Sequence, residues 1–151
     1  MAEKTRYKSF EYHSQLKWLA ERKGVLEFGD GKPPLEVATP VEFRGHPGII
    51  TPEDMLLGAA SACTMTTFLS LAEREKLVFT SYRDESWGVI SHDGEVYRYT
   101  EAKIKIFLTI EREEDRDRAE ALIEKSHRFC FIANSLRFPI EVTAHIEVSG
   151  K

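Results

Sequence analysis

The feature that most constrains this chain is an apolar run from Met55 to Ala72 that contains no charged residue. The four residues before the run, with the sequence TPED, have the features of a helix start. They offer an N-cap threonine, a proline at the first helical position and two carboxylates where the helix dipole favours them. We therefore predict one long helix from Thr51 to about Glu75. Because its residues are apolar or small on every face, this helix needs cover on most sides.

The same run is a poor match for a membrane span. A lipid-crossing helix needs roughly 20 strongly apolar residues, whereas this run includes Gly58, Ser61 and Ser70 and is bounded by Asp54 and Glu73. Residues 1–10 have no apolar segment of the kind that marks a secretory signal. We therefore expect no membrane partner and a cytoplasmic location.

Length and composition indicate one folded domain. The chain has 151 residues, of which 42% are hydrophobic and 30% charged, and this balance is typical of globular proteins. We therefore interpret residues 1–151 as a single domain. The net charge of -4 provides no basic excess to neutralise a phosphate backbone, so nucleic acid is not an expected partner.

Alternating polar and apolar residues predict strands on both sides of the long helix. Before the helix, three short runs separated by turn residues predict an antiparallel meander: Phe10 to Leu19, Lys23 to Phe28 and Leu35 to Phe43. After the helix, the alternation predicts three strands: Ser81 to Ile90, Tyr97 to Ile110 and Ile140 to Val148. Two shorter helices, from about Asp115 to Lys125 and from Cys130 to Leu136, are expected between the last two strands. The predicted fold class is therefore α+β.

The two cysteines are the strongest candidates for chemistry. Cys63 lies in the middle of the apolar helix, and Cys130 follows the amphipathic helix. A cytoplasmic protein rarely keeps a structural disulfide, so the two thiols need another explanation. The simplest alternative is that both are small buried hydrophobic residues, as free cysteines often are.

Other kinds of site receive little support from the sequence. A zinc site needs three or four ligands, but His127 and Cys130 are the only closely spaced pair, so no metal is expected. The remaining histidines fall at polar strand positions or in loops: His13, His46, His92 and His145. The sequence contains no Gly-x-Ser-x-Gly elbow and no phosphate-binding loop in its proper context. No cofactor is expected.

Two segments resemble the cysteine motifs of the OsmC/Ohr family of thiol-dependent hydroperoxide reductases. The segment TPEDMLLGAASAC, which ends at Cys63, resembles that family's Asn-Pro-Glu-[Glu/Gln]-Leu-x-x-Ala-Ala-x-x-Ala-Cys. The segment CFIANSL, which begins at Cys130, resembles its Cys-Pro-Val-Ser-Asn-x-Leu. Lys17-Trp18 leading to Lys23-Gly24 resembles the family's first hairpin. The resemblance spans nearly the whole chain, with both motifs in the expected order.

The resemblance implies an intertwined α+β homodimer in which two central helices, one from each chain, are wrapped by antiparallel sheets. The apolar helix supports this arrangement independently, because a twin helix would supply the wall that one chain of this length hardly provides. The alternative is that the chain's own sheets suffice.

The resemblance also implies a reaction with organic hydroperoxides. Cys63 would attack the O–O bond as a thiolate and become a sulfenic acid, and Cys130 would resolve it as a Cys63-Cys130 disulfide. A dithiol reductant, of the dihydrolipoamide type in the family, would reopen that disulfide by exchange. A thiolate at neutral pH needs a nearby cation or a helix N-terminus. By this reasoning Cys130 has the helix N-terminus and Cys63 would need the cation.

A glutamate and an arginine complete the family's site. Glu53 of the Pro-Glu motif corresponds to the glutamate. Aligning Phe43 with the family's Arg-Phe pair puts Glu42 at the arginine position, so the candidate is Arg44, a cation in the same loop. Three further departures indicate a divergent branch with a substrate preference of its own: Thr51 replaces Asn, Phe131 replaces Pro and Ala133 replaces Ser.

A second hypothesis is a non-enzymatic, ligand-binding or redox-sensing dimer that keeps the cysteines but lacks a competent arginine. Apolar residues near the cysteines favour organic hydroperoxides as substrates, although each is as well explained by an ordinary core position: Met65, Phe68, Phe129 and Phe131. Glu53 and Cys63 are separated by about 15 Å along one straight helix. If they share a site, we expect them to come from different chains.

Overall fold

A computed structural model describes residues 7–150 and divides the chain into two compact units, residues 1–52 and residues 53–151. The positions of the two units relative to each other are not determined, so the single domain stays a prediction. Residues 1–6, where the sequence predicts no signal segment, lie outside the described residues.

The N-terminal unit contains a three-stranded antiparallel meander, as predicted. Its strands are β1 (Gln15–Ala20), β2 (Lys23–Glu27) and β3 (Leu35–Ala38), in that order across the sheet. β1 begins later than the alternation suggests, and Phe10 lies exposed before it. Leu16 and Trp18, on the apolar side of β1, are 64% and 75% exposed. The alternation therefore identifies the strand, but its apolar face stays exposed among the described residues.

The third strand ends at Ala38 rather than at Phe43. The N–H groups of Phe43 and Gly45 both donate to the carbonyl oxygen of Pro40, at 3.0 and 2.9 Å, and this turn forms the short 3₁₀ helix η1 (Val41–Phe43). A Cβ atom at Gly45 would lie 1.5 Å from the Thr39 carbonyl oxygen, so the turn requires glycine there. The expected strand is cut short because the backbone folds back on itself.

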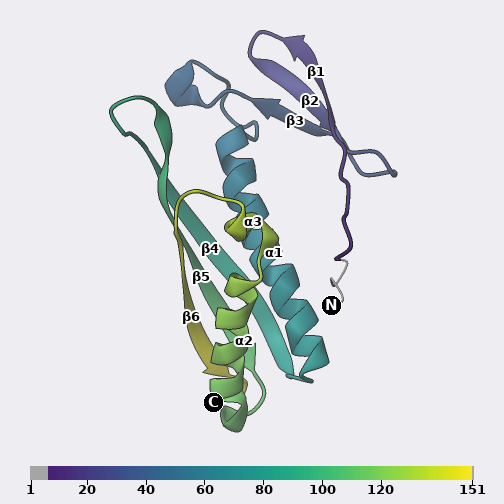
Figure 1. Cartoon of the computed structure of the whole chain (residues 1–151), viewed down its shortest axis with the longest axis vertical. Coiled ribbons are helices and arrows are strands. Elements are labelled where there is room, and N and C mark those ends of the chain that lie inside the picture. Colours follow the sequence, from purple (N-terminus) through teal and green to yellow (C-terminus); the bar gives the residue numbers. More distant parts are fainter. Residues whose placement is uncertain (1–6, 151) are drawn as a thin grey trace, which may run out of the picture. The chain divides into compact units, whose positions relative to one another are not determined.

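The C-terminal unit places helices on one face of a three-stranded sheet, and Figure 1 shows α1 and α2 side by side on that face. The strands are β4 (Phe79–His92), β5 (Tyr97–Ile110) and β6 (Ile140–Val148). The helices are α1 (Pro52–Arg74), the 3₁₀ turn η2 (Glu113–Asp115), α2 (Arg116–Arg128) and α3 (Phe131–Asn134). The α+β class is confirmed, and β6 has the bounds that the alternation predicts.

One strand pairing differs from the expected antiparallel sheets. β4 and β5 form an antiparallel hairpin, but β6 pairs with β5 in parallel, from Ala102 opposite Ile140 to Ile110 opposite Val148. The reason is the connection: α2 carries the chain back along the sheet before β6 begins, and a helical crossover joins parallel strands.

The core lies between the helices and β5. Every second residue of β5 from Ala102 to Ile110 is at most 2% exposed, which confirms the predicted alternation. Phe68 of α1 and Leu122 of α2 belong to the same buried cluster. Complete burial of one such side chain contributes about 1.5–3 kcal/mol to stability. This packing therefore fixes α1 and α2 against the sheet.

Only one side of α1 is buried by the described residues. The buried positions are Ala60, Thr64, Phe68, Leu71 and Ala72, whereas Gly58, Ala59, Ala62, Thr66 and Leu69 are exposed. Among the helices described, α1 alone is long and apolar enough to cross a membrane, and 28% of its apolar 18-residue stretch is buried. A core helix passes the same test, and α1 does contact the core, so this is weak evidence for a membrane.

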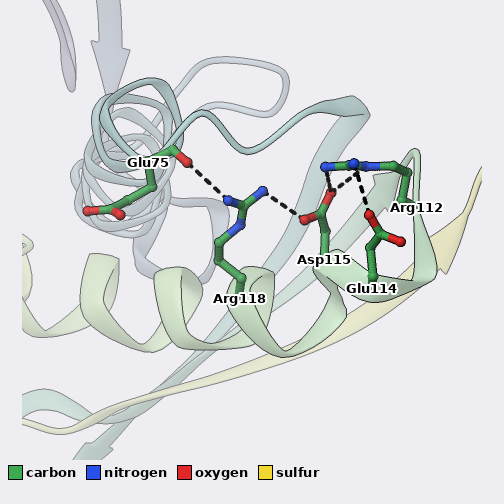
Figure 2. A network of polar contacts seen from close by, with 5 residues as sticks. All are labelled: Glu75, Arg112, Glu114, Asp115 and Arg118. Atoms are coloured by element: carbon green, nitrogen blue, oxygen red, sulfur yellow. Dashed lines mark hydrogen bonds and ion pairs between the residues drawn. The ribbon is translucent and has the colours of Figure 1, made fainter.

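A buried carboxylate joins the start of α2 to the end of α1 (Figure 2). Asp115 is 5% exposed and accepts hydrogen bonds from Arg112, at 3.1 and 3.2 Å, and from Arg118, at 2.7 Å. Arg118 also donates to the carbonyl oxygen of Glu75, at 3.3 Å, just beyond the end of α1. The charge of Asp115 therefore holds two guanidinium groups, one of which contacts the chain after α1.

We predict that Asp115→Asn lowers the free energy of unfolding by about 1–3 kcal/mol, because it weakens charged hydrogen bonds at a buried site. Chemical denaturation measures this change. Glu114→Gln is the matched control, since Glu114 is exposed and bonds only to Arg112 among these residues, and the expected change is about 0–1 kcal/mol. Equal effects of the two substitutions on the free energy of unfolding would contradict the stabilising role of the Asp115 carboxylate.

Candidate functional site

The structure brings the two predicted cysteines together. Cys63 lies in the middle of α1, and Cys130 directly precedes α3, which lies beside α1 (Figure 1). The Cys130 Sγ atom is 4.0 Å from the carbonyl oxygen of Ala60, one turn before Cys63. The two side chains are also hydrogen-bonded to each other. Residues far apart in the sequence therefore form one dithiol pair, with both thiols free.

The two thiols differ in exposure. Cys130 is 0% exposed, whereas Cys63 is half-buried and retains access to solvent. An external reagent therefore reaches Cys63 first. This asymmetry argues against the interpretation of both cysteines as equivalent small core residues.

The surroundings of Cys63 favour its thiolate. Burial raises the pKa of the Cys63 thiol, but hydrogen bonds from the Ile132 and Phe131 backbone N–H groups, the Cys130 thiol and the Thr67 hydroxyl outweigh it. The net result is a pKa below the ordinary value for cysteine. All these donors are neutral groups, and four of them converge on one sulfur atom.

The surroundings of Cys130 favour its protonated form. Burial raises the pKa of the Cys130 thiol, and its contact with Cys63 raises it further. Hydrogen bonds from the Ala133 N–H and the Thr64 hydroxyl act in the opposite direction without cancelling the rise. Cys130 therefore keeps its proton under conditions in which Cys63 has begun to lose its own.

This division corrects one half of the sequence-based expectation. We expected the N-terminus of the short helix to serve Cys130 and a cation to serve Cys63. Cys130 is the N-cap of α3 and its sulfur accepts from Ala133 N–H at 3.4 Å, as expected, but the same helix start also takes the place of the cation at Cys63. The first N–H groups of α3, those of Phe131 and Ile132, act on Cys63. The sequence identifies the helix start, but not which neighbouring side chain faces it.

Glu53 lies on the same unit as the cysteines but not beside them within one chain. It occupies the first turn of α1, and the Tyr99 hydroxyl donates to its backbone oxygen at 3.0 Å. α1 is continuous to Cys63, so the two residues lie about 15 Å apart along its axis. The Oε2 atom of Glu53 is buried and has no hydrogen-bond partner among the described residues.

Arg44 belongs to the N-terminal unit, at the end of η1. It is exposed and has a φ of 63°, in the left-handed region, and its N–H donates to the Val41 carbonyl oxygen at 3.0 Å. The structure adds a second cation to this loop, because Arg22 donates to the carbonyl oxygen of Phe43 at 3.0 Å. The sequence does not reveal Arg22 because it lies in the turn between β1 and β2, and both β2 and β3 separate it from the loop along the chain.

Comparison with known proteins identifies the family. Residues 45–145 match the model of the family described as OsmC-like protein. The chain belongs to the OsmC-like family. It is 24% identical to YmaD, an uncharacterized protein of Bacillus subtilis, over 93% of this chain and 99% of that protein.

Solved structures agree with this OsmC-like fold. An OsmC-like protein of unknown function from Vibrio cholerae is similar with a TM-score of 0.82 and 19% identity, over 91% of this chain and all of that one. An organic hydroperoxide resistance protein from Legionella pneumophila is similar with a TM-score of 0.73 and 21% identity, over 94% of this chain and 100% of that chain. At these identities the similarity establishes the fold.

Two threonines of this OsmC-like protein were missed by sequence reasoning. Thr64 is 0% exposed, and its hydroxyl contacts both the Ala60 carbonyl oxygen, at 2.9 Å, and the sulfur of Cys130. Thr67 donates to the Cys63 carbonyl oxygen, at 2.8 Å, and its hydroxyl helps to lower the pKa of the Cys63 thiol. The available signal was the four-residue spacing from Cys63 to Thr67. Within residues 7–150, no group of three or more His, Cys, Asp or Glu side chains is placed to hold a metal ion.

We predict that iodoacetamide modifies Cys63 well before Cys130. Cys63 is the accessible thiol, and its lowered pKa makes it a thiolate at a lower pH than an ordinary cysteine, so its alkylation rate rises at a lower pH. Mass spectrometry of quenched samples measures the order of modification. The Cys63→Ser variant should react slowly while folded, and preferential labelling of Cys130 in the folded wild type would contradict the assignment.

Proposed function

We propose that this protein is a thiol-dependent peroxidase that reduces organic hydroperoxides through Cys63 and Cys130 and is recycled by a dithiol. The observation that carries the proposal is the asymmetric thiol pair: a half-buried Cys63 with a lowered pKa, hydrogen-bonded to a fully buried Cys130 with a raised pKa. Membership of the OsmC-like family, and a structural relative named as an organic hydroperoxide resistance protein, support the same function.

In the first step, the Cys63 thiolate attacks the terminal oxygen of the hydroperoxide. An S–O bond forms and the O–O bond breaks, and the departing alkoxide takes a proton and leaves as an alcohol. Cys63 is oxidised to a sulfenic acid while the peroxide is reduced. The N–H groups of Phe131 and Ile132 stabilise the attacking thiolate without adding charge to the site.

In the second step, the Cys130 sulfur attacks the sulfenic sulfur of Cys63, and water leaves with the thiol proton. The Cys130 sulfur lies 4.0 Å from the Ala60 carbonyl oxygen, one turn before Cys63 on α1, so the disulfide would join segments that are already neighbours. A dithiol then attacks the disulfide, passes through a mixed disulfide and departs in its oxidised form, leaving both thiols restored.

We predict steady consumption of cumene hydroperoxide when a dithiol such as dihydrolipoamide is supplied in excess. Cys63→Ser should abolish turnover. Cys130→Ser should consume about one equivalent of peroxide if it stops at sulfenic acid, and one further equivalent for each higher oxide that forms. Peroxide consumption and intact-protein mass measure these outcomes. A single stoichiometric disulfide without turnover would instead favour the redox-sensing function, which the replacement of the family arginine by Glu42 would explain.

We also propose that the protein is a homodimer with shared sites, as the family resemblance implies. The exposed side of α1 carries small and apolar residues that a second copy of the helix would cover. Antiparallel crossing of two such helices would bring Glu53 of one chain toward Cys63 of the other. The buried, unpartnered Oε2 atom of Glu53 is consistent with a partner supplied from outside the chain. Arg44 is the cation that we propose for this site, by the family resemblance alone.

We predict that inactive Cys63→Ser and inactive Glu53→Ala subunits complement each other when mixed. In a mixed dimer, one site receives its intact Cys63 and Glu53 from different chains, so random exchange should restore about one quarter of the wild-type activity. Exchange is verified by mass difference. Mixtures that exchange yet stay inactive would exclude shared sites. A separate comparison of peroxide turnover in Arg44→Ala and Arg22→Ala decides which of these two cations contributes to the reaction.

A further inference from the structure

Large apolar side chains flank the buried Cys130 in the sequence, and the core does not cover them. Phe131 is 77% exposed, Phe129 48% and Ile132 36%. The sequence alone allows Phe129 and Phe131 an ordinary core position, and these exposures exclude it. Neighbouring apolar side chains that stay exposed typically mark a binding surface.

This apolar cluster lies beside the accessible thiol. The Cys130 sulfur is 4.0 Å from the carbonyl oxygen of Ala60, and Cys63 follows Ala60 by three residues, about 4.5 Å along the axis of α1. Cys130 is the N-cap of α3, so Phe131 is the first residue of that helix. α3 itself lies beside α1 (Figure 1). The ring of Phe131 is therefore carried at the edge of the Cys63 site.

The faces of the Phe131 ring are open, unlike those of the ring of Phe129. The Arg128 guanidinium lies 5.7 Å from the centre of the Phe129 ring and covers one of its faces. Within residues 7–150, no second ring or cation lies over Phe131. Two aromatic rings attract each other more than the area that they bury would predict. Phe131 therefore offers an aromatic ligand a contact that an aliphatic ligand of the same size lacks.

We propose that Phe131 is a specificity-determining residue that contacts the organic group of the substrate at Cys63, and that hydroperoxides with an aromatic group are the preferred class. The inference rests on the proposed function and deepens it by naming the substrate class. The ring binds the organic group and exchanges no electron or proton, so the steps at the two sulfur atoms are unchanged. The preference is particular to this chain, because the family motif has proline at this position and proline offers no aromatic face.

The test compares two alkylating agents of similar size, N-phenylmaleimide and N-cyclohexylmaleimide, on the reduced full-length protein. The rate of Cys63 modification by each reagent is divided by its rate with N-acetylcysteine, which removes differences in intrinsic reactivity. Because both reagents attack the same thiolate, the ratio of the two normalised rates does not depend on the pKa of Cys63. We expect this ratio to favour the phenyl reagent about threefold to tenfold. Mass spectrometry verifies that the label is on Cys63.

Three variants test the role of the ring. Phe131→Ala should lower the ratio to about one, whereas Phe131→Tyr, which retains the ring, should keep the wild-type ratio. Phe10→Ala is the matched control, because Phe10 is 75% exposed and belongs to the N-terminal unit, so the ratio should not change. Circular dichroism verifies that each variant is folded.

Three results would overturn the inference: an unchanged ratio in Phe131→Ala, an equal loss in Phe131→Tyr, or an equal loss in Phe10→Ala. Sedimentation of the same variants tests the other occupant of this surface, a second copy of the chain. A ratio that falls only together with dissociation of a dimer would place Phe131 in a contact between copies and would also overturn the inference.

The outcomes separate this inference from the proposed function, because the labelling needs no peroxide. A ratio that falls in Phe131→Ala, in a protein without peroxide turnover, supports the aromatic contact at Cys63 and rejects the peroxidase. Turnover with an unchanged ratio does the reverse. Where both hold, kcat/KM for cumene hydroperoxide relative to tert-butyl hydroperoxide should fall about threefold to tenfold in Phe131→Ala.

Discussion

The packing of α1 against β5 and α2 is the interaction on which the rest of the site depends. Phe68 anchors the C-terminal half of α1 in the core, and this fixes the two preceding turns, which carry Ala60 and Thr64, against Cys130. Cys63 then falls beside the buried face rather than on it. The partial exposure of Cys63 and its contact with the buried thiol therefore both follow from the orientation of α1 about its own axis.

Much of the fold could be predicted from the sequence because its main signals are local. Alternation located β5 and β6, and the TPED segment located the start of α1. Predictions failed where alternation says nothing about the path of the backbone. β6 is parallel because of the α2 crossover, and β3 stops early because Pro40 accepts two backbone hydrogen bonds from the turn that follows it.

The candidate site, like the fold, could be predicted only in part. Motif resemblance selected Cys63 and Cys130, and the structure places them in contact. It could not assign their electrostatic roles, because those depend on which sulfur faces the N–H groups of Phe131 and Ile132. Thr64 and Thr67 were overlooked because a threonine inside an apolar helix looks the same whether or not its hydroxyl reaches a sulfur.

The parallel pairing of β5 with β6 also governs when the dithiol pair can form. Parallel strands meet only after a long loop has closed, and such non-local contacts form slowly compared with helices and hairpins. α1 and the β4–β5 hairpin are made of local contacts, whereas Cys130 is carried on the crossover between β5 and β6. During synthesis on the ribosome, Cys63 therefore emerges before Cys130 is in place. Under the proposed function, a nascent chain that meets an oxidant at this stage has no route to the internal disulfide, so completion of the crossover is the point at which Cys63 would gain a resolving thiol.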